Sequence, residues 1–242
     1  FEISIFDNTE REREDLLKKQ LTQNIAHELK TPVSGIRGYL ETILSTPDID
    51  PDKRNLFMER CYAQARRLSD LLHDISMLNR LDESTDLFDR QTIDLAHVIK
   101  DVIGETANTL ESKAMSVNLH NIETPMLIEG NYALLYSIFR NLTDNAAAYA
   151  GEGTQIQINC YLTNEKYYYI SFSDNGCGVD EIHLQRLFER FYRVDKGRSR
   201  KLGGTGLGLA IVKNAVLFHG GEVMAKNAAG GGLEILFTLR KK

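Results

Sequence analysis

Residues 24–32 have the sequence N-I-A-H-E-L-K-T-P and lie inside a long stretch of helical spacing. On a helix that turns about 100° per residue, the isoleucine and leucine of this stretch share one face, and His27 lies opposite them, where we expect solvent. Thr31 follows His27 by four positions and shares its face, and Glu28 is the adjacent carboxylate. The segment would therefore place a nucleophile, a base and a hydroxyl within one turn.

Alone, this segment is a weak signal for chemistry. A surface histidine beside a glutamate is most often only a solvated helix position. The zinc-protease motif H-E-x-x-H is excluded, because Thr31 stands where the second histidine is required. The rest of the chain has to decide between a structural and a chemical role.

The helical pattern around this segment predicts a pair of long helices. Apolar residues recur at helical spacing over residues 17–44, past Pro32, where we expect a kink. Two prolines in residues 46–51 end this helix, and a second one is predicted over 52–81 with coiled-coil spacing of its leucines. Such an antiparallel hairpin buries its seam poorly alone, so we expect a homodimer that forms a four-helix bundle.

The second half of the chain has a different pattern. The acidic stretch 82–89 has no apolar periodicity and predicts a linker, which we place at 83–90. After it, helices are predicted at 96–113, 132–150 and 206–218, and strands at 116–122, 125–129, 155–163, 167–173, 221–227 and 233–239, with a loop-rich stretch at 174–205. This alternation predicts an α+β sandwich with helices on one face of a mixed sheet.

Composition excludes several classes of protein. The 242 residues contain no apolar run long enough for a membrane span, and the net charge of −5 disfavours a nucleic-acid binder. Three scattered cysteines disfavour a metal knuckle and indicate a reducing cytosol. We therefore expect a cytoplasmic chain without nucleic-acid or membrane contacts of its own. Residues 1–5 alternate like the end of a strand, so we expect a part cut from a larger protein.

Two glycine-rich turns are candidates for ligand binding. Residues 203–208, G-G-T-G-L-G, open a predicted helix, where backbone N–H groups can meet phosphate. They match neither the Walker A motif nor the G-x-G-x-x-G fingerprint. The other turn, 174–178, follows an apolar strand directly, and Asp174 at the strand end could accept a hydrogen bond from a ligand amine.

Polar residues between the motifs extend this pattern. Asn141 and Asn145 lie one turn apart on a predicted helix, and their amide oxygens could complete a Mg²⁺ shell beside phosphates, while Tyr149 could pack on a base. Residues 188–193, F-E-R-F-Y-R, precede a run of cations that could neutralise a polyphosphate, namely Lys196, Arg198, Arg200 and Lys201. Singly, each feature is more often structural.

The order of these motifs closely resembles that of bacterial sensor histidine kinases. Their H, N, G1, F and G2 boxes correspond to residues 24–32, 141–146, 174–178, 188–193 and 204–209 here. The resemblance covers about residues 16–240. It implies a dimerisation and histidine phosphotransfer domain at 16–82, a linker at 83–90 and a Bergerat-type ATP-binding domain at 91–242. Residues 1–15 would be a linker or the end of an upstream sensor.

The resemblance also implies roles for single residues. His27 would be the phosphoacceptor, Glu28 would orient its ring and take its proton, and Thr31 would position water during dephosphorylation of a partner. Arg193 would contact the γ-phosphate. ATP and Mg²⁺ would be the cofactors, held by the remaining box residues: Asn145 and Asn141 at the metal, Tyr149, Asp174, Gly176 and Gly178 around the adenine, and Gly204, Thr205, Gly206, Leu207 and Gly208 at the phosphates.

The implied function is autophosphorylation of His27 from ATP, followed by transfer to an aspartate of a response regulator receiver domain, and phosphatase activity toward that partner. The receiver would dock near Val33, Ile36, Tyr39 and Leu40, or at residues 62–67. The full-length protein would be anchored in the bacterial inner membrane. Ala148 departs from the family pattern, because relatives often have a lysine there, and one possible phosphate contact is then absent.

Two rival functions remain to be weighed. ATPases of the gyrase and Hsp90 kind place a glutamate, which activates water, at the position of Asn141, so simple ATP hydrolysis is disfavoured. A kinase-deficient module that only docks to or dephosphorylates its partner is the alternative from another class. Against it, His27, Asn145, Asp174 and the G2 glycines occur together.

Overall fold

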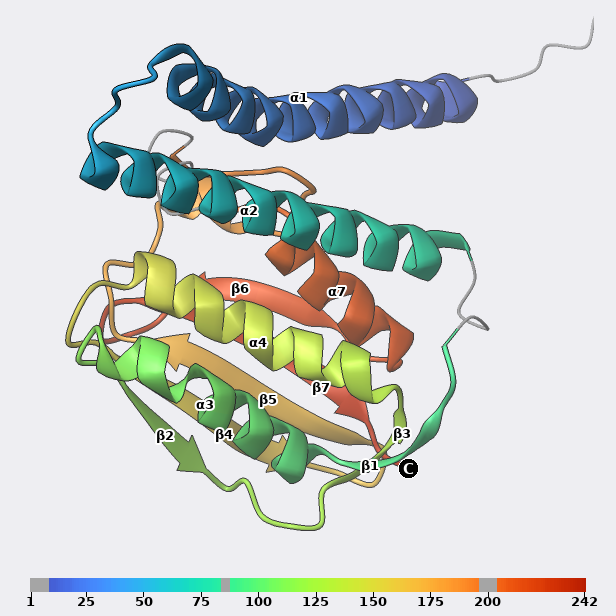
Figure 1. Cartoon of the computed structure of the whole chain (residues 1–242). Coiled ribbons are helices and arrows are strands. Elements are labelled where there is room, and N and C mark those ends of the chain that lie inside the picture. Colours follow the sequence, from blue (N-terminus) through green and yellow to red (C-terminus); the bar gives the residue numbers. More distant parts are fainter. Residues whose placement is uncertain (1–8, 84–87, 196–203) are drawn as a thin grey trace, which may run out of the picture. The chain divides into compact units, whose positions relative to one another are not determined.

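The computed structural model describes residues 9–83, 88–195 and 204–242, which form two compact units, residues 1–73 and 74–242 (Figure 1). The strand expected at residues 1–5 lies outside the described residues. So do the four cations predicted to neutralise a polyphosphate between 196 and 201. No helix in the described ranges is both long enough and apolar enough to cross a membrane.

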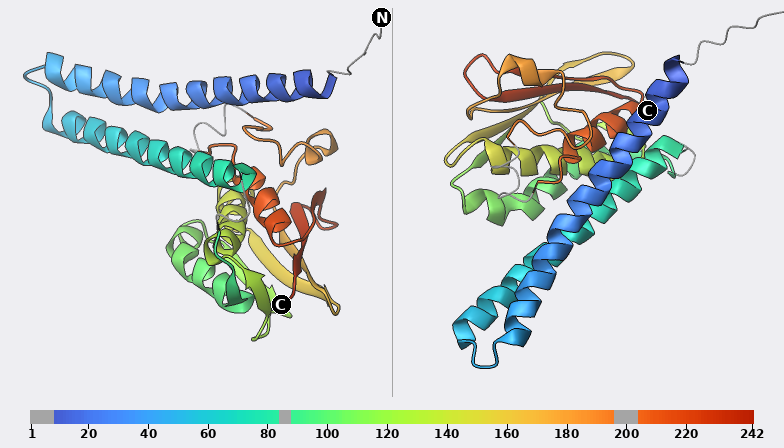
Figure 2. Two further views of the ribbon diagram at one scale, coloured as in Figure 1. Left: turned by 90° about the vertical axis from the view of Figure 1, so that its right-hand side faces the viewer. Right: turned by 90° about the horizontal axis from the view of Figure 1, so that it is seen from above.

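Two long helices, α1 (Thr9–Ser45) and α2 (Pro51–Glu83), form the antiparallel hairpin (Figure 2). Pro51 suits the first position of α2, since its missing N–H would have no helical partner there, and Asp50 Oδ2 accepts a hydrogen bond from Lys53 N at 3.2 Å. As predicted, α1 continues past Pro32. The kink at Pro32 stays a prediction.

Side chains join the two helices of the hairpin along a thin seam. The rings of Tyr39 and Phe57 lie 5.4 Å apart, and Gly35 packs against Gln64. Several large apolar side chains of the same helices remain exposed: Val33, Leu40, Leu44, Leu56, Met58 and Tyr62. The hairpin alone therefore leaves much of its apolar surface in contact with water.

The second unit contains a five-stranded mixed sheet in the order β2-β4-β5-β7-β6. The strands are β2 (Ser116–His120), β4 (Gln155–Thr163), β5 (Tyr167–Asp174), β7 (Leu233–Arg240) and β6 (Val223–Asn227). Only β2 and β4 pair in parallel. The helices α3 (Leu95–Glu111), α4 (Tyr132–Tyr149) and α7 (Gly208–Phe218) cover one face of this sheet (Figure 1). The predicted hairpin followed by a mixed-sheet α+β domain is confirmed.

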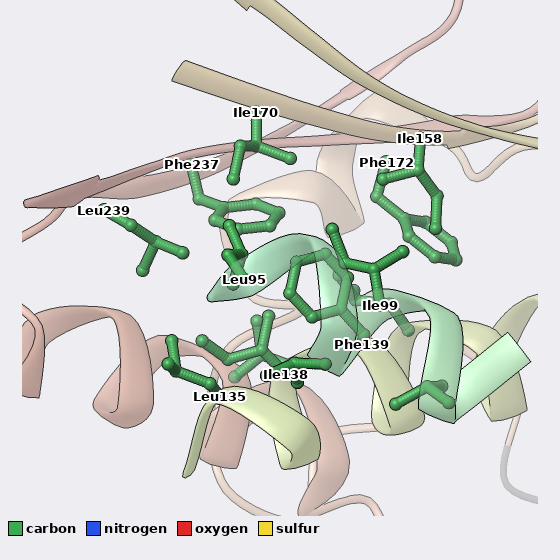
Figure 3. Close-up of a cluster of buried hydrophobic side chains, with 14 of the residues drawn as sticks. Leu95, Ile99, Leu135, Ile138, Phe139, Ile158, Ile170, Phe172, Phe237 and Leu239 are labelled. Carbon is green, nitrogen blue, oxygen red and sulfur yellow. The ribbon is translucent and has the colours of Figure 1, made fainter. Parts of the chain in front are cut away.

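The core lies between this sheet and its helices (Figure 3). Alternate residues of each central strand point toward the helices, as the two-residue period of a strand requires, and Ile158, Ile170 and Phe237 are nearly inaccessible to water. Phe139 of α4 meets Phe237 of β7 with ring centroids 5.9 Å apart. This packing fixes α4 and α7 over the sheet, and both helices carry predicted site residues.

The structure differs from the sequence prediction at a few short elements. A two-stranded sheet forms from β1 (Gln91–Asp94), which was not predicted, and β3 (Leu127–Gly130), which begins two residues later than predicted. A short helix, α5 (Glu181–Leu184), lies inside the predicted loop. The helix predicted from residue 206 begins at Gly208 instead, because Gly206 has a φ of +75° and cannot continue a right-handed helix.

Candidate functional site

His27 lies on the solvent face of α1, as its spacing predicts, with 62% of its side chain exposed. Its Nδ1 is 3.9 Å from Glu28 Oε1, which is beyond hydrogen-bond distance. Thr31 Oγ1 donates a hydrogen bond to the carbonyl oxygen of His27 at 3.2 Å, so its hydroxyl is held one turn below the imidazole. The three predicted residues of this segment do lie together.

Glu28 makes a second interaction that sequence reasoning missed. Its other carboxylate oxygen, Oε2, lies 3.5 Å from a terminal guanidinium nitrogen of Arg67 on α2, and the two side chains are only 13% and 14% exposed. The carboxylate thus spans the hairpin, with one oxygen toward His27 and the other toward Arg67. The pairing depends on the register between the helices, which sequence spacing alone does not give.

Asn141 of α4 faces the first residue of α7. Its Nδ2 donates to Ser137 O at 2.8 Å, and its Oδ1 is so close to Gly208 that a Cβ there would lie 2.6 Å from it. Any larger residue at 208 would displace the Asn141 side chain, so glycine lets the amide oxygen of Asn141 lie beside the start of α7. Asn145 follows one turn later on α4 and is half-buried.

The turn after β5 packs against the end of α4. Asp174 Oδ1 accepts hydrogen bonds from Gly176 N at 2.9 Å and Leu233 N at 3.4 Å. Within the described ranges no hydrogen bond uses its Oδ2, which is therefore available to a ligand amine. A Cβ at Gly176 would lie 2.4 Å from Ala150 O, so this turn touches the residue after Tyr149.

Gly178 and the exposed Cys177 complete this turn. Gly178 has a φ of +64°, a left-handed conformation that favours glycine. Cys177 Sγ lies 3.7 Å from the carbonyl oxygen of Tyr149. The contact brings the half-buried tyrosine at the end of α4 beside the G1 turn, as a shared adenine-binding role would require.

The two segments that carry Arg193 and the G2 glycines are joined by their backbones. Phe191 N donates to Gly206 O at 2.8 Å, and a Cβ at Gly206 would lie 3.0 Å from Phe191 Cα and 3.2 Å from Arg193 Nε. Arg193 is thus held beside the glycine loop, in which Gly204 is half-buried. Thr205 Oγ1 accepts from Leu207 N at 3.2 Å and donates to Asp74 Oδ2 at 3.0 Å.

The start of α7 is suited to an anion. Leu207 precedes the helix and is buried, and α7 has no side-chain cap among the described residues. The first N–H groups of a helix lack helical partners and carry its positive dipole end. A glycine-rich loop that leads into such a helix start is the arrangement that binds phosphate in many proteins.

His219, which sequence reasoning also missed, joins the far ends of α4 and α7. It is 2% exposed. Its Nε2 accepts a hydrogen bond from Asn131 N, before α4, and its Nδ1 donates to Ala215 O in α7. Burial lowers the pKa of His219 to about 4, and the positive charge of Arg90 contributes in the same direction. The neutral ring thereby fixes how the two helices carrying Asn141 and Gly208 lie side by side.

Two family models match the chain in succession. Residues 17–84 match the His Kinase A (phospho-acceptor) domain, and residues 130–242 match the histidine kinase-, DNA gyrase B- and HSP90-like ATPase family. The first match contains His27, and the second contains the predicted nucleotide-binding residues.

Similar proteins include sensor histidine kinases that are longer than this chain. The chain is 33% identical to the sensor histidine kinase WalK of Bacillus subtilis, over 98% of this chain and 39% of the relative. It is also 33% identical to the sensor-like histidine kinase SenX3 of Mycolicibacterium smegmatis, over 95% of this chain and 59% of the relative. The chain therefore spans less than two thirds of the length of these relatives.

Solved structures share the fold. Histidine kinase ThkA in complex with response regulator protein TrrA has a TM-score of 0.73 at 18% identity, over 97% of this chain and 65% of that one. Histidine kinase AdeS of Acinetobacter baumannii has a TM-score of 0.67 at 19% identity, over 89% of this chain and 98% of that one. Since both family models match in the order in which the motifs occur, the chain belongs to the two-component sensor histidine kinases.

Proposed function

We propose that this chain is the catalytic portion of a sensor histidine kinase that transfers the γ-phosphoryl group of ATP to His27 and then to an aspartate of a response regulator. The observation that carries the proposal is the meeting, in the second unit, of Asn141 with Gly208 and of Arg193 with Gly206. These contacts bring an amide and a guanidinium group close to the glycine residues before and at the start of α7, which supports a shared role of these groups in binding phosphate.

The residues fit ATP. The uncapped start of α7 and the glycine loop supply N–H groups to the phosphates, and Gly208 leaves space that any Cβ would fill. Asp174 Oδ2 accepts from the exocyclic amine of adenine, and Tyr149 lines the base. Arg193 contacts the γ-phosphate. Ala148 offers no charge, so the cation role falls on Arg193.

Mg²⁺ also fits the donor set. Asn145, with Asn141 nearby, contributes neutral amide oxygens of the kind that a magnesium ion takes alongside phosphates and water. When bound, the ion neutralises charge on the phosphate oxygens. The hydrogen bond from Asn141 Nδ2 to Ser137 O fixes that amide group, so its oxygen is oriented before nucleotide arrives.

On the acceptor side, we propose different roles for the two imidazole nitrogens of His27. Nδ1 is the nitrogen near Glu28, so Nε2 is left to attack the γ-phosphorus. The Nε2–P bond forms as the bond from phosphorus to the oxygen of ADP breaks. Positive charge that develops on the ring is stabilised by the Glu28 carboxylate, which takes the Nδ1 proton. Thr31 positions water for the reverse task, dephosphorylation of the partner.

Asn141 favours transfer over hydrolysis. Gyrase-like and Hsp90-like ATPases need a carboxylate at that position to activate water, and an amide is not a base. With nucleotide bound and no such base, the exposed imidazole of His27 is the nucleophile that the chain itself offers.

We further propose a homodimer formed through the hairpin and a response regulator receiver domain as the partner. Support comes from the uncovered apolar side chains of the hairpin, among them Leu44, which is 82% exposed. After His27 along α1, Val33 and Leu40 are 50% and 41% exposed, and Tyr62 on α2 is 69% exposed. They offer the receiver an apolar contact surface. Histidine kinase ThkA, whose fold this chain shares, has been solved in complex with a response regulator protein, TrrA.

Phosphoryl transfer from ATP labelled at its γ-phosphate tests the proposal. We expect an acid-labile, alkali-stable label on the chain that is lost in His27→Ala. His73→Ala is the matched control, because His73 is another exposed histidine of the hairpin and should leave the label unchanged. Label that persists in His27→Ala would overturn the assignment. An unlabelled chain that still dephosphorylates its partner would favour the docking and phosphatase alternative.

A further inference from the structure

The segment that leads to Arg193 is held by a cluster of four side chains, His183, Arg186, Glu189 and Tyr192, here called the tyrosine clamp. His183 Nδ1 and the Tyr192 hydroxyl lie 2.7 Å apart in a hydrogen bond. The Arg186 guanidinium lies 4.2 Å from the centroid of the Tyr192 ring. The clamp therefore holds Tyr192 at its hydroxyl and at its ring.

The members of the clamp support one another. Arg186 donates to both carboxylate oxygens of Glu189, at 3.1 and 3.0 Å, which keeps its guanidinium plane in place over the tyrosine. This ion pair is exposed, so it contributes little stability by itself. His183 and Tyr192 are half-buried, and their hydrogen bond is the contact that water replaces least easily.

The backbone beside the clamp is constrained as well. Phe191 has a φ of +62°, a conformation that costs a non-glycine residue about 1 kcal/mol or more, and its N–H is held by Gly206 O. Phe191 has this fixed backbone conformation, and Tyr192 is held at its hydroxyl and its ring. The position of the next Cα, that of Arg193, is therefore restricted. Its Nε lies beside Gly206 as a result.

We propose that His183 and Tyr192 are positioning residues for Arg193, and that through it they set how strongly this chain prefers ATP to ADP. The role rests on the proposed function, since it needs Arg193 to meet the γ-phosphate. His183 lies before the F box, in α5, and reaches that box only through the fold. A purely structural cluster would instead affect both nucleotides alike, because ADP uses the same adenine and glycine contacts.

The test compares two affinities of the full chain in Mg²⁺, one for ADP and one for the non-hydrolysable β,γ-imido analogue of ATP. Tyr192→Phe keeps the ring under Arg186 but removes the hydroxyl. We expect it to weaken binding of the analogue about threefold to tenfold, the range for one lost hydrogen bond, with ADP affinity changed less than about twofold. His183→Ala should do the same. Gln185→Ala, an exposed neighbour in the same turn, is the control and should change neither affinity.

A double-mutant cycle separates positioning from stability. Arg193→Gln should by itself remove most of the preference for the analogue, and Tyr192→Phe should then have no further effect in that background. Effects that simply add, or equal losses for ADP and the analogue, would overturn the positioning role. If the unsubstituted chain bound no ADP, the proposed function would be wrong. If it bound ADP but the clamp variants kept the full preference for the analogue, only the positioning role would be wrong.

Discussion

Acid should selectively destabilise the second unit through His219. In the folded chain the ring is neutral, because Nε2 accepts from the Asn131 N–H and the residue is only 2% exposed. Its pKa is lowered from 6.5 to about 4 by burial and by Arg90. The difference, 6.5 − 4, is about 2.5 pKa units, which at about 1.36 kcal/mol per unit corresponds to about 3 kcal/mol.

Whether stability rises or falls with pH depends on which state, folded or unfolded, binds the proton more readily. The unfolded chain takes up the proton near pH 6.5, whereas the folded chain takes it up only near pH 4. This contribution to stability is therefore complete above about pH 6.5 and is lost as the pH falls from about 6.5 to about 4. By pH 5, about 1.5 units below the unfolded pKa, the loss should be about 2 kcal/mol.

The contribution of His219 to the free energy of unfolding can be measured by urea unfolding of the wild type and of His219→Gln, each at pH 7.5 and pH 5. The glutamine amide oxygen can accept from the Asn131 N–H but does not titrate, so it isolates the histidine from the carboxylates that both proteins share. We expect wild type to lose about 2 kcal/mol more than His219→Gln over this interval. Amide exchange in α4 and α7 should show the same difference locally. Equal pH dependence of the two proteins would refute the reasoning.

Three further predictions concern the sites. Arg67→Gln removes the cation that pairs with the Glu28 carboxylate next to His27. It should slow label transfer to His27 several-fold without changing the affinity for ADP. Arg66→Gln, at an exposed neighbouring arginine, is the control and should change neither quantity. Gly206→Ala should weaken nucleotide binding, measured by calorimetry, because the added methyl would crowd the backbone at Phe191. Gly153→Ala is the control. Gly153 has a similar φ of +71° but open space around it, so this change should lower stability without weakening nucleotide binding. Asp174→Asn should lower ADP affinity about tenfold, because an amide N–H₂ can then face the adenine amine; unchanged affinity would place the adenine elsewhere.

Much of the fold was predictable because its signals are local. Long helical periodicity located α1 and α2, and strict alternation gave β4 its observed bounds. The short elements β1 and α5 were missed, since four residues carry too little pattern and their stability comes from a distant partner strand or a packed side chain. Periodicity also could not show that α7 begins only at Gly208. The positive φ of Gly206, which delays the start of the helix, arises only in the folded turn.

The site residues, too, were predictable only where a local sequence pattern marks them. Each box is a short run that can be recognised within the sequence, so the residues of the N, G1, F and G2 boxes could be named without coordinates. Arg67, His183 and His219 carry no such signature. Each acquires its partner only when separate segments meet, as when Arg67 on α2 reaches Glu28 on α1. Residue type alone gives no reason to choose Arg67 over its neighbour Arg66.

The small sheet of β1 and β3 joins the beginning of the mixed-sheet region to its end. Lys241 forms a bridge with Ile128 of β3, and Lys242 bonds to Thr92 of β1 through Nζ and to Leu127 through its backbone N–H. The chain thus enters and leaves this region at one seam, close to where the C-terminus is marked in Figure 1. A pull or twist delivered through β1 would therefore first load the hydrogen bonds that join it to the C-terminal end of the chain. The upstream helix has a second connection to this region, because Asp74 of α2 accepts a hydrogen bond from Thr205 of the glycine loop, so a movement of α2 reaches that loop without passing through the small sheet.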